Sequence, residues 1–404
     1  MRDVERIERI QQALKTESCD ALVCALPSNV LLLSGYFPVI GTSIAIATRE
    51  GAIALLVPED ELELAQRGWA DQLVTFQPAS LEKLTTAAAE ITEPLRRILS
   101  KLGLTEAVIG CEHAESLQPA TYSARYLYGT TLPIAMRSAV PLATQKEADD
   151  LLARLRAVKT SAEIVRIRIA CQIASAAFVA GAAAVRPGML ETEIAELFRS
   201  TLRTPPEGTD ITRAEGFVWC MAGANSAQAG AAYALSRPYA VSQNDPVLVH
   251  CNSHVDGYWT DITRTYCLGE PDRQLRTIYD AVFSARAAAM SAIKPGAEAS
   301  AVDRVARELL RARGLENTFN HSTGHGVGFT GIDPNALPRL HPKSPDVLET
   351  GMVFNLEPAV YLEDVGGVRH CDMLVVTEQG YELLTPFQTT IRELAISGPE
   401  KQAA

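Results

Sequence analysis

The stretch "VLVHCNSHVDGYWTDITRTYCL", residues 247–268, decides the fold of the second half of the chain. Asp256 and Gly257 form a two-residue turn signal between two runs of strand-forming residues, which predicts a β-hairpin. If the turn is tight, Asn252 faces Asp261 across the hairpin. The position of every other side chain in the hairpin follows from this register.

One face of the hairpin is polar and the other is apolar. The register sets His250 opposite Thr263, and the alternation of side chains brings these two residues to the same face as Asn252 and Asp261. A polar face of this kind is either exposed to solvent or lines a polar site, and alternation alone favours exposure. The opposite face carries the apolar side chains of a core, namely Val249, Cys251 and Ile262.

Two other stretches place possible metal ligands in unusual surroundings. In "TGHGVGF", residues 323–329, the glycines on both sides of His325 let other groups approach closely. In "MVFNLEPAVYL", residues 352–362, Glu357 follows the apolar residues of a predicted strand. A buried carboxylate needs a partner, and an ion pair and a metal ion are equally good interpretations.

A further strand is predicted for "GGVRHCDMLVV", residues 366–376. Alternation puts Arg369 and Cys371 on one face and His370 on the other. His370 is therefore not expected to be a ligand. His341 lies in a loop-like context that favours a surface role or a supporting one.

Composition limits the class of protein. The chain has 404 residues, 47% hydrophobic and 21% charged, which favours a globular enzyme of two domains. A net charge of -11 disfavours nucleic acid and anionic membranes as partners. The start lacks the apolar core of a secretory signal, and the longest apolar runs are shorter than the roughly 18 residues of a membrane span. Eight cysteines without a Cys-x-x-Cys pair indicate reduced thiols and a cytoplasmic protein.

The chain is predicted to divide near residue 150. Residues 1–150 alternate helical patterns with short apolar runs, which favours an α/β domain, and residues 151–404 form the second domain. Similar phrases begin at Val185 ("VRPGMLETEIAELF") and at Ile293 ("IKPGAEASAVDRVARELL"), about 108 residues apart. They indicate an internal duplication whose two halves would face each other across a site.

Four motifs in order carry a resemblance to a known family. They are "DGYWTDITRT" (256–265), "HSTGHGVG" (321–328), "FNLEPAVY" (354–361) and "GGVRHCDMLVVTEQG" (366–380). Their order resembles the pita-bread superfamily of Xaa-Pro aminopeptidases, prolidases, methionine aminopeptidases and creatinase. "CDALVCALPSNVLLLSGY" (19–36) is similar to the amino-terminal domain of prolidases and creatinase. The resemblance implies an α/β chain with a creatinase-like amino-terminal domain and a carboxy-terminal pita-bread domain.

The peptidases of this superfamily hold two metal ions with five residues. Asp261, His325 and Glu357 match three of these ligands, whereas His250 and Cys371 stand where the family has an aspartate and a glutamate. The resemblance therefore implies a single divalent cation, zinc, iron or manganese, on Asp261, His325 and Glu357, completed by Cys371 or His250. An empty site is an equally favoured alternative, and an intact pair of metals is a less favoured one. Without a metal, Glu357 and His325 could act as general base and acid.

The positions that contact substrate in the family are partly changed. Gly230 and Ile332 stand where the peptidases carry two histidines, and Thr263 stands where creatinase has a glutamate. Tyr361 and Arg369, which lie beside the substrate in prolidase-like proteins, are retained. We also predict a substrate contact at His321.

These residues predict a divergent hydrolase that cleaves a C–N bond of a small amide, amidine or X-Pro-like dipeptide substrate. Asp261, His325 and Glu357 would be its catalytic residues. The alternative is a non-catalytic pseudo-peptidase that acts as a binding or scaffold protein. The resemblance also implies a homodimer.

Overall fold

The computed structural model describes residues 2–39, 42–78, 81–112, 131–205, 208–231 and 234–396. The tail "SGPEKQAA", whose composition predicts a flexible end, lies outside these residues. The chain divides into two compact units, Met1–Arg156 and Ala157–Ala404. The division falls a few residues after the boundary expected near residue 150.

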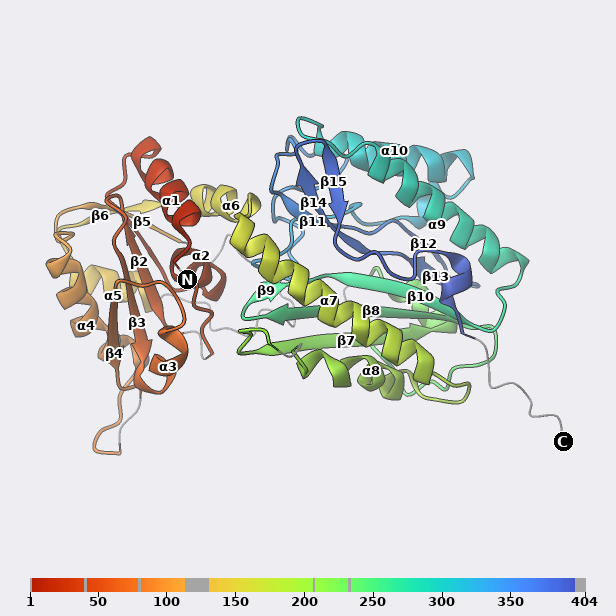
Figure 1. The fold of residues 1–404 in the computed structure, drawn as a ribbon, viewed down its shortest axis with the longest axis horizontal. Helices are drawn as coiled ribbons and strands as arrows, with labels where there is room; N and C mark the ends of the chain where they lie inside the picture. The colour runs from red at the N-terminus through yellow and green to blue at the C-terminus, as the bar shows by residue number, and fades with distance from the viewer. Residues whose placement is uncertain are drawn as a thin grey trace. The chain divides into compact units, whose positions relative to one another are not determined.

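The first unit is built on a six-stranded sheet with the order β4-β3-β2-β1-β5-β6 (Figure 1). Its strands are β1 (Ala21–Cys24), β2 (Ile44–Thr48), β3 (Ile53–Pro58), β4 (Gln72–Phe76), β5 (Val108–Cys111) and β6 (Thr144–Glu147). Its helices are α1 (Val4–Thr16), α2 (Pro27–Ser34), α3 (Leu62–Ala65), α4 (Ala87–Lys101), α5 (Thr131–Ala139) and α6 (Asp149–Ala157). The apolar runs that predicted strands form β1, β2 and β3, so the expected α/β class is confirmed.

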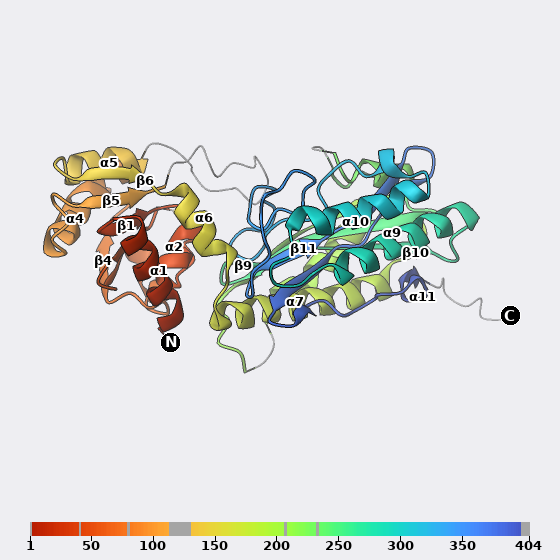
Figure 2. The same cartoon turned by 90° about the horizontal axis from the view of Figure 1, so that it is seen from above.

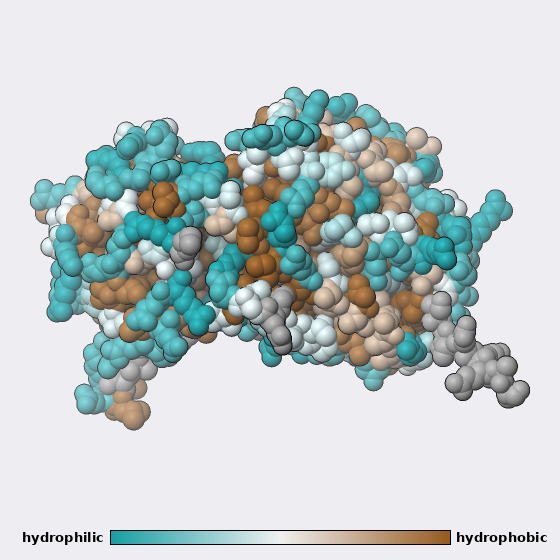
Figure 3. All heavy atoms as spheres, viewed as in Figure 1, coloured by the Kyte–Doolittle hydropathy of each residue, from teal (hydrophilic) through white to brown (hydrophobic). Residues whose placement is uncertain are grey.

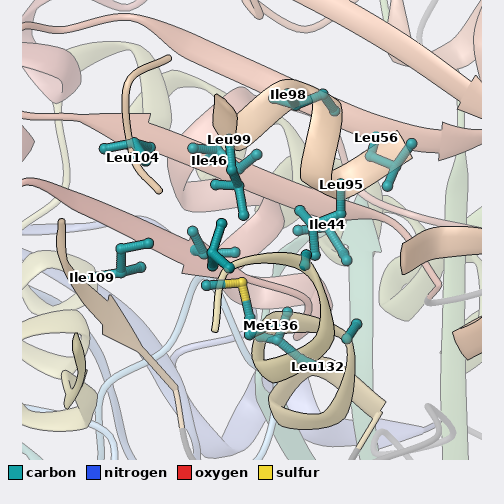
Figure 4. Packing of buried hydrophobic residues seen from close by; sticks show 14 of the residues in the cluster. Ile44, Ile46, Leu56, Leu95, Ile98, Leu99, Leu104, Ile109, Leu132 and Met136 are labelled. Atoms are coloured by element: carbon teal, nitrogen blue, oxygen red, sulfur yellow. The ribbon is translucent and has the colours of Figure 1, made fainter. Parts of the chain in front are cut away.

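The core of the first unit lies between its sheet and two helices. Side chains from the strands interlock with side chains from α4 and α5 (Figure 4). The strands β1, β2 and β3 are buried at every residue, which explains why they read as continuous apolar runs rather than as alternating ones. The labelled members of the cluster include Ile44, Ile46, Leu56, Leu95, Ile98, Leu99, Leu132 and Met136.

The second unit has helices against antiparallel sheets (Figures 1 and 2). The first sheet contains β7 (Ala214–Ala222), β8 (Pro246–Val255), β9 (Tyr258–Trp259), β10 (Ile262–Leu268) and β16 (Ala395–Ile396). The others contain β11 (Val353–Leu356), β14 (Asp372–Thr377) and β15 (Gly380–Leu383), and the pair β12 (Ala359–Leu362) and β13 (Gly366–Arg369). The helices are α7 (Ser161–Ala184), α8 (Glu191–Arg199), α9 (Arg273–Ser291), α10 (Ala299–Ala312) and α11 (Ile391–Leu394).

The hairpin has the predicted register. Thr263 pairs with His250, and beyond them His254 pairs with Trp259 next to the turn. Asp256 adopts a positive φ of 46° and Gly257 one of 88°, as this tight turn requires. The interpretation of the polar face as solvent-exposed is wrong, because Asn252 is fully buried. Alternation identifies a face, but only the packing of other elements decides whether water reaches it.

Two stretches that were each predicted as one strand are interrupted at the site. "MVFNLEPAVYL" divides at Glu357 into β11 and β12, and "GGVRHCDMLVV" divides into β13 and β14 around Cys371. Pro358 supplies no N–H for a ladder, so the chain leaves one sheet and enters another there. Cys371 exchanges two backbone hydrogen bonds with Thr263 of β10, at 3.0 and 3.3 Å. The interruptions thus bring Glu357 and Cys371 to the polar face of the hairpin.

The predicted duplication is visible in the backbone hydrogen bonds. Gly188 donates to the carbonyl of Val241, and Gly296 donates to that of Leu348, both at 2.8 Å. Both glycines have a positive φ, 87° and 80°, and each precedes a helix, α8 and α10. The hairpin belongs to the first half and β11 to β14 belong to the second, so the candidate site residues come from both halves.

Helix α7 runs along the sheet of β7, β8 and β10 (Figures 1 and 2). With 24 residues and a mean hydropathy of 1.6 it is the one helix of the described chain that could cross a membrane by length and composition. The sequence-based expectation considered only uninterrupted apolar runs and missed it. Half of its most apolar window is buried, as in the core helix of a globular protein, and the face of the unit on which it lies shows both hydrophilic and hydrophobic residues (Figure 3).

We expect Asp372→Asn to lower the free energy of unfolding by about 3–5 kcal/mol, measured by urea denaturation. Asp372 is fully buried and accepts from Arg264 at 2.7 Å and from Arg286 at 2.5 Å, so its loss leaves two buried guanidinium groups without a counter-charge. Asp210→Asn, which breaks an exposed ion pair with Arg166, should change the free energy of unfolding by about 1 kcal/mol or less. Equal effects of the two substitutions would contradict this account.

Candidate active site

Two glycines let the backbone close tightly around His325. A Cβ at Gly324 would lie 2.0 Å from the carbonyl oxygen of Asn355, and one at Gly326 would lie 2.1 Å from that of Leu337. Asn355 N–H donates to the His325 carbonyl at 3.0 Å, and Asn355 Oδ1 accepts from the His325 N–H at 2.7 Å. The close approach inferred from "TGHGVGF" is therefore confirmed, and it fixes the ring beside the second sheet.

Asp261 is the centre of the site and is almost fully buried. Its Oδ2 lies 3.6 Å from His325 Nε2 and accepts a hydrogen bond from Asn355 Nδ2 at 3.2 Å. Its Oδ1 faces the other way, 3.6 Å from His250 Nδ1 and 3.7 Å from Cys371 Sγ. Burial raises the pKa of Asp261, but the neighbouring histidines outweigh it, so that the pKa is lowered and the group stays ionised.

His325 is oriented by its own backbone. Its Nδ1–H donates to the Gly326 carbonyl at 3.1 Å, which leaves Nε2 to face Asp261. Burial lowers the pKa of His325, but the hydrogen bond and charge of Asp261, together with Glu357, raise it to about 9. The ring therefore carries a proton at neutral pH unless a cation displaces it.

Glu357 and Arg369 form a loose buried pair, with 3.9 Å between Arg369 Nε and Glu357 Oε2. Burial raises the pKa of Glu357 to about 7, and the positive charge of Arg369 limits the rise. Arg369 Nη1 also lies 3.5 Å from the Tyr361 hydroxyl, which in turn donates to His321 Nε2 at 3.0 Å. Arg369 Nη2 makes no hydrogen bond with any residue that the structure describes. The three predicted substrate contacts thus form one connected row.

His250 is held in a chain of hydrogen bonds. Arg369 Nε donates to Thr263 Oγ1 at 3.1 Å, and the Thr263 hydroxyl donates to His250 Nδ1 at 2.9 Å. His250 Nε2–H donates to Asn252 Oδ1 at 3.0 Å, and Asn252 Nδ2 donates to the Thr260 carbonyl at 3.1 Å. Burial lowers the pKa of His250 to about 4, so the ring is neutral. Because Nδ1 already accepts a hydrogen bond, His250 is poorly suited to be a ligand.

The donor atoms of Asp261, Glu357 and Cys371 lie within 4.8 Å of one another. Among the described residues, these are the ones grouped closely enough to hold a metal ion. The group does not contain His325, which the resemblance placed with Asp261 and Glu357 as a ligand, or His250, which was expected to complete the set. Two carboxylates and a thiol are chemically suited to one divalent cation such as Zn²⁺ or Fe²⁺. This group of donors could hold one divalent cation.

The remaining candidate positions are placed as follows. His370 points away from Cys371, lies 3.4 Å from Asp372 and has its ring centre 4.9 Å from that of Phe283. His341 is exposed. Gly230 lies against the substrate row, because a Cβ there would come within 2.9 Å of Tyr361. A side chain at position 230 would also come within 2.8 Å of Asn320 Oδ1, so Asn320 and Tyr361 would both have to shift.

Sequence reasoning missed two neighbours of the site. Asn355 lies in β11, two residues before Glu357, and in the single strand that the sequence predicted this spacing would have placed both residues on one face. Trp219 pairs with His250 across β7 and β8, and the two ring centres are 5.7 Å apart. In "GFVWC", residues 216–220, the aromatic residues Phe217 and Trp219 alternate along the strand, and this pattern could have identified Trp219.

The fold and the buried carboxylate, histidine and thiol groups define a peptidase-like hydrolase of the pita-bread class. Residues 165–378, more than half of the chain, match the family model described as metallopeptidase family M24. The chain belongs to this family. Residues 6–138 match the creatinase/prolidase N-terminal domain. The expected superfamily is confirmed, and membership supports a divalent metal cofactor in general terms.

Relatives cover the chain over almost its whole length. The Xaa-Pro dipeptidase of Pyrococcus furiosus is 29% identical over 390 residues, which is 96% of this chain and 99% of that protein. The solved prolidase from Pyrococcus horikoshii OT3 is 26% identical with a TM-score of 0.74, covering 94% of this chain and 98% of the other. An X-Pro aminopeptidase from Thermotoga maritima, 23% identical with a TM-score of 0.77 over 96% of this chain and 99% of the other, shares the fold.

We expect Cys371→Ser to reduce zinc affinity at least roughly tenfold, because a hydroxyl is a much poorer ligand for zinc than a thiolate. The fold should be kept, since serine can still donate to the Asp261 carbonyl, which Cys371 Sγ contacts at 3.2 Å. Competition with a chromogenic chelator measures the affinity. Cys251→Ser, on the opposite face of the hairpin, is the matched control. Equal zinc affinity of Cys371→Ser and wild type would remove Cys371 from the ligand set.

Proposed function

We propose that this protein hydrolyses a C–N bond of a small, carboxylate-bearing amide such as a dipeptide, with one divalent cation held by Asp261, Glu357 and Cys371. The observation that carries the proposal is the donor cluster of these three residues beside Arg369, whose Nη2 makes no hydrogen bond with the described residues. The Xaa-Pro dipeptidase relatives support a dipeptide as the substrate.

The roles of the chain's own residues follow from charge and position. Arg369, with Tyr361 and His321 beside it, would bind the carboxylate of the substrate, since a guanidinium suits a carboxylate in geometry and charge. His325 holds a proton, because its pKa is raised to about 9, and would give it to the departing nitrogen. A cation bound at the cluster would polarise the scissile carbonyl and lower the pKa of water.

Burying these groups keeps water from competing for them. Asp261 is 1% exposed, and Glu357 and Arg369 are 8% and 7% exposed. Charge interactions are stronger in such surroundings than in water. A scaffold protein would have no need to bury Glu357 so close to Asp261, whose charge raises the pKa of Glu357. A cytoplasmic location and a homodimer stay predictions from the sequence.

The proposal is tested with protein loaded with one equivalent of zinc, iron or manganese and offered X-Pro dipeptides. We expect turnover of dipeptides with a free carboxylate and a loss of roughly 10–100-fold in kcat/KM for their carboxyl amides, because the charge-assisted bond to Arg369 is absent. Arg369→Gln should raise KM by a similar factor for the free dipeptides and remove the difference between the two substrates.

Arg168→Gln is the matched control, because it removes an arginine of the same unit whose partner is the exposed Glu382. Its KM should equal that of the wild type. If no dipeptide, amide or amidine is cleaved with any of the three metals, the hydrolase proposal fails, and a binding protein remains.

Cation affinity should rise with pH. Glu357, with its pKa raised to about 7, is protonated below that pH, and burial raises the pKa of the Cys371 thiol, so that a cation must displace its proton as well. We expect the affinity for Zn²⁺ to increase roughly 100-fold per pH unit below 7, where two protons are displaced, and about tenfold per unit above it. Titration calorimetry at pH 6, 7 and 8 measures this. An affinity independent of pH would exclude these two residues as ligands.

A further inference from the structure

Asn355 lies between the charged groups of the site, and the orientation of its amide is fixed. Its Oδ1 accepts the backbone N–H of His325 at 2.7 Å, so that Nδ2 must point the other way. Nδ2 donates to Asp261 Oδ2 at 3.2 Å and lies 3.3 Å from His325 Nε2. Asn355 is fully buried, so water does not compete for these contacts.

The side-chain nitrogen of Asn355 borders the space that a cation shared by Asp261 and His325 would need. Asp261 Oδ2 and His325 Nε2 are 3.6 Å apart, close to the roughly 3.3 Å expected for two ligands bound about 2 Å from one zinc ion. Asn355 Nδ2 is near both atoms and presents hydrogens that carry positive partial charge. A cation here would meet these hydrogens and would be repelled by them.

The exclusion does not depend on the proton of His325. When the ring is neutral, Nε2 accepts an N–H of Asn355, because Nδ1–H donates to the Gly326 carbonyl. When the ring is protonated, Nε2–H itself faces Asp261. In neither arrangement does His325 offer a lone pair to a metal ion.

The other side of Asp261 is different. Its Oδ1 faces Cys371 Sγ, with which it can share a cation once the thiol loses its proton, and Glu357 completes that group. The two oxygens of the Asp261 carboxylate therefore have different neighbours. Oδ2 is bound by a neutral amide, and Oδ1 is open to a metal ion.

We propose that the Asn355 amide takes the place of a second cation between Asp261 and His325, and that the site consequently holds at most one divalent cation. This inference deepens the proposed function and rests on it for the single cation at Asp261, Glu357 and Cys371. Asn355 is a positioning residue, because it acts through Asp261 and His325.

The test is Asn355→Asp. Aspartate keeps the acceptor for the His325 N–H but replaces the Nδ2 hydrogens with a carboxylate oxygen, so that a repelling group becomes a ligand. Metal content is measured by elemental analysis after dialysis against excess Zn²⁺ or Mn²⁺, and the shift in Tm on metal addition is recorded in parallel. We expect one more equivalent per chain than in the wild type and a larger rise in Tm. Asn317→Asp, which adds the same charge at an exposed position, should bind as much metal as the wild type.

Each outcome decides the matter. An Asn355→Asp protein with the metal content of the wild type overturns the inference, and so does a wild-type protein that takes up two equivalents. If the wild type binds none and Asn355→Asp binds one, the single-cation part of the proposed function fails while the exclusion by Asn355 stands. If Asn355→Asp does not fold, Asn355→Ala is measured by the same criterion, because it removes the N–H groups without adding a carboxylate.

Discussion

The ionised Asp261 carboxylate, almost without contact with water, is the constraint on which the rest of the site depends. A buried charge is costly unless donors or counter-charges surround it. Three different side chains meet this requirement, namely His325, Asn355 and Cys371. Asp261 lies on the hairpin and these three residues lie in the second half of the unit, so both halves must be folded before the charge is compensated.

Local patterns predicted the features that depend on neighbours along the chain. The turn signal at Asp256 correctly predicted the register of the hairpin. The glycines on both sides of His325 correctly predicted that other backbone segments approach it closely. The same patterns could not show that the polar face of the hairpin is buried, because the elements that cover it are about a hundred residues away in sequence. The same patterns also missed the breaks at Glu357 and Cys371, where the chain changes from one sheet to another.

The set of possible metal ligands also depends on contacts that the sequence does not show. Comparison with the family by position identified His250 and Cys371 as substituted residues, but it did not show what each substitution does. In the structure the two differ: Cys371 joins a group of possible ligands, whereas His250 is neutral and engaged by Thr263 and Asn252. The spacing of Asn355 to Glu357 could have drawn attention to this residue, but it does not display the contact of Asn355 with His325 across the fold.

The chain of hydrogen bonds from Arg369 through Thr263, His250 and Asn252 to the Thr260 carbonyl has one further consequence. A guanidinium cannot accept a hydrogen bond and a carbonyl cannot donate one, so the two ends impose a single direction on every bond between them. The tautomer of His250 is thereby chosen by groups that never touch its ring. Such a wall of the site is preorganised, because its dipoles are already aligned before substrate arrives and need no rearrangement when charge develops beside them.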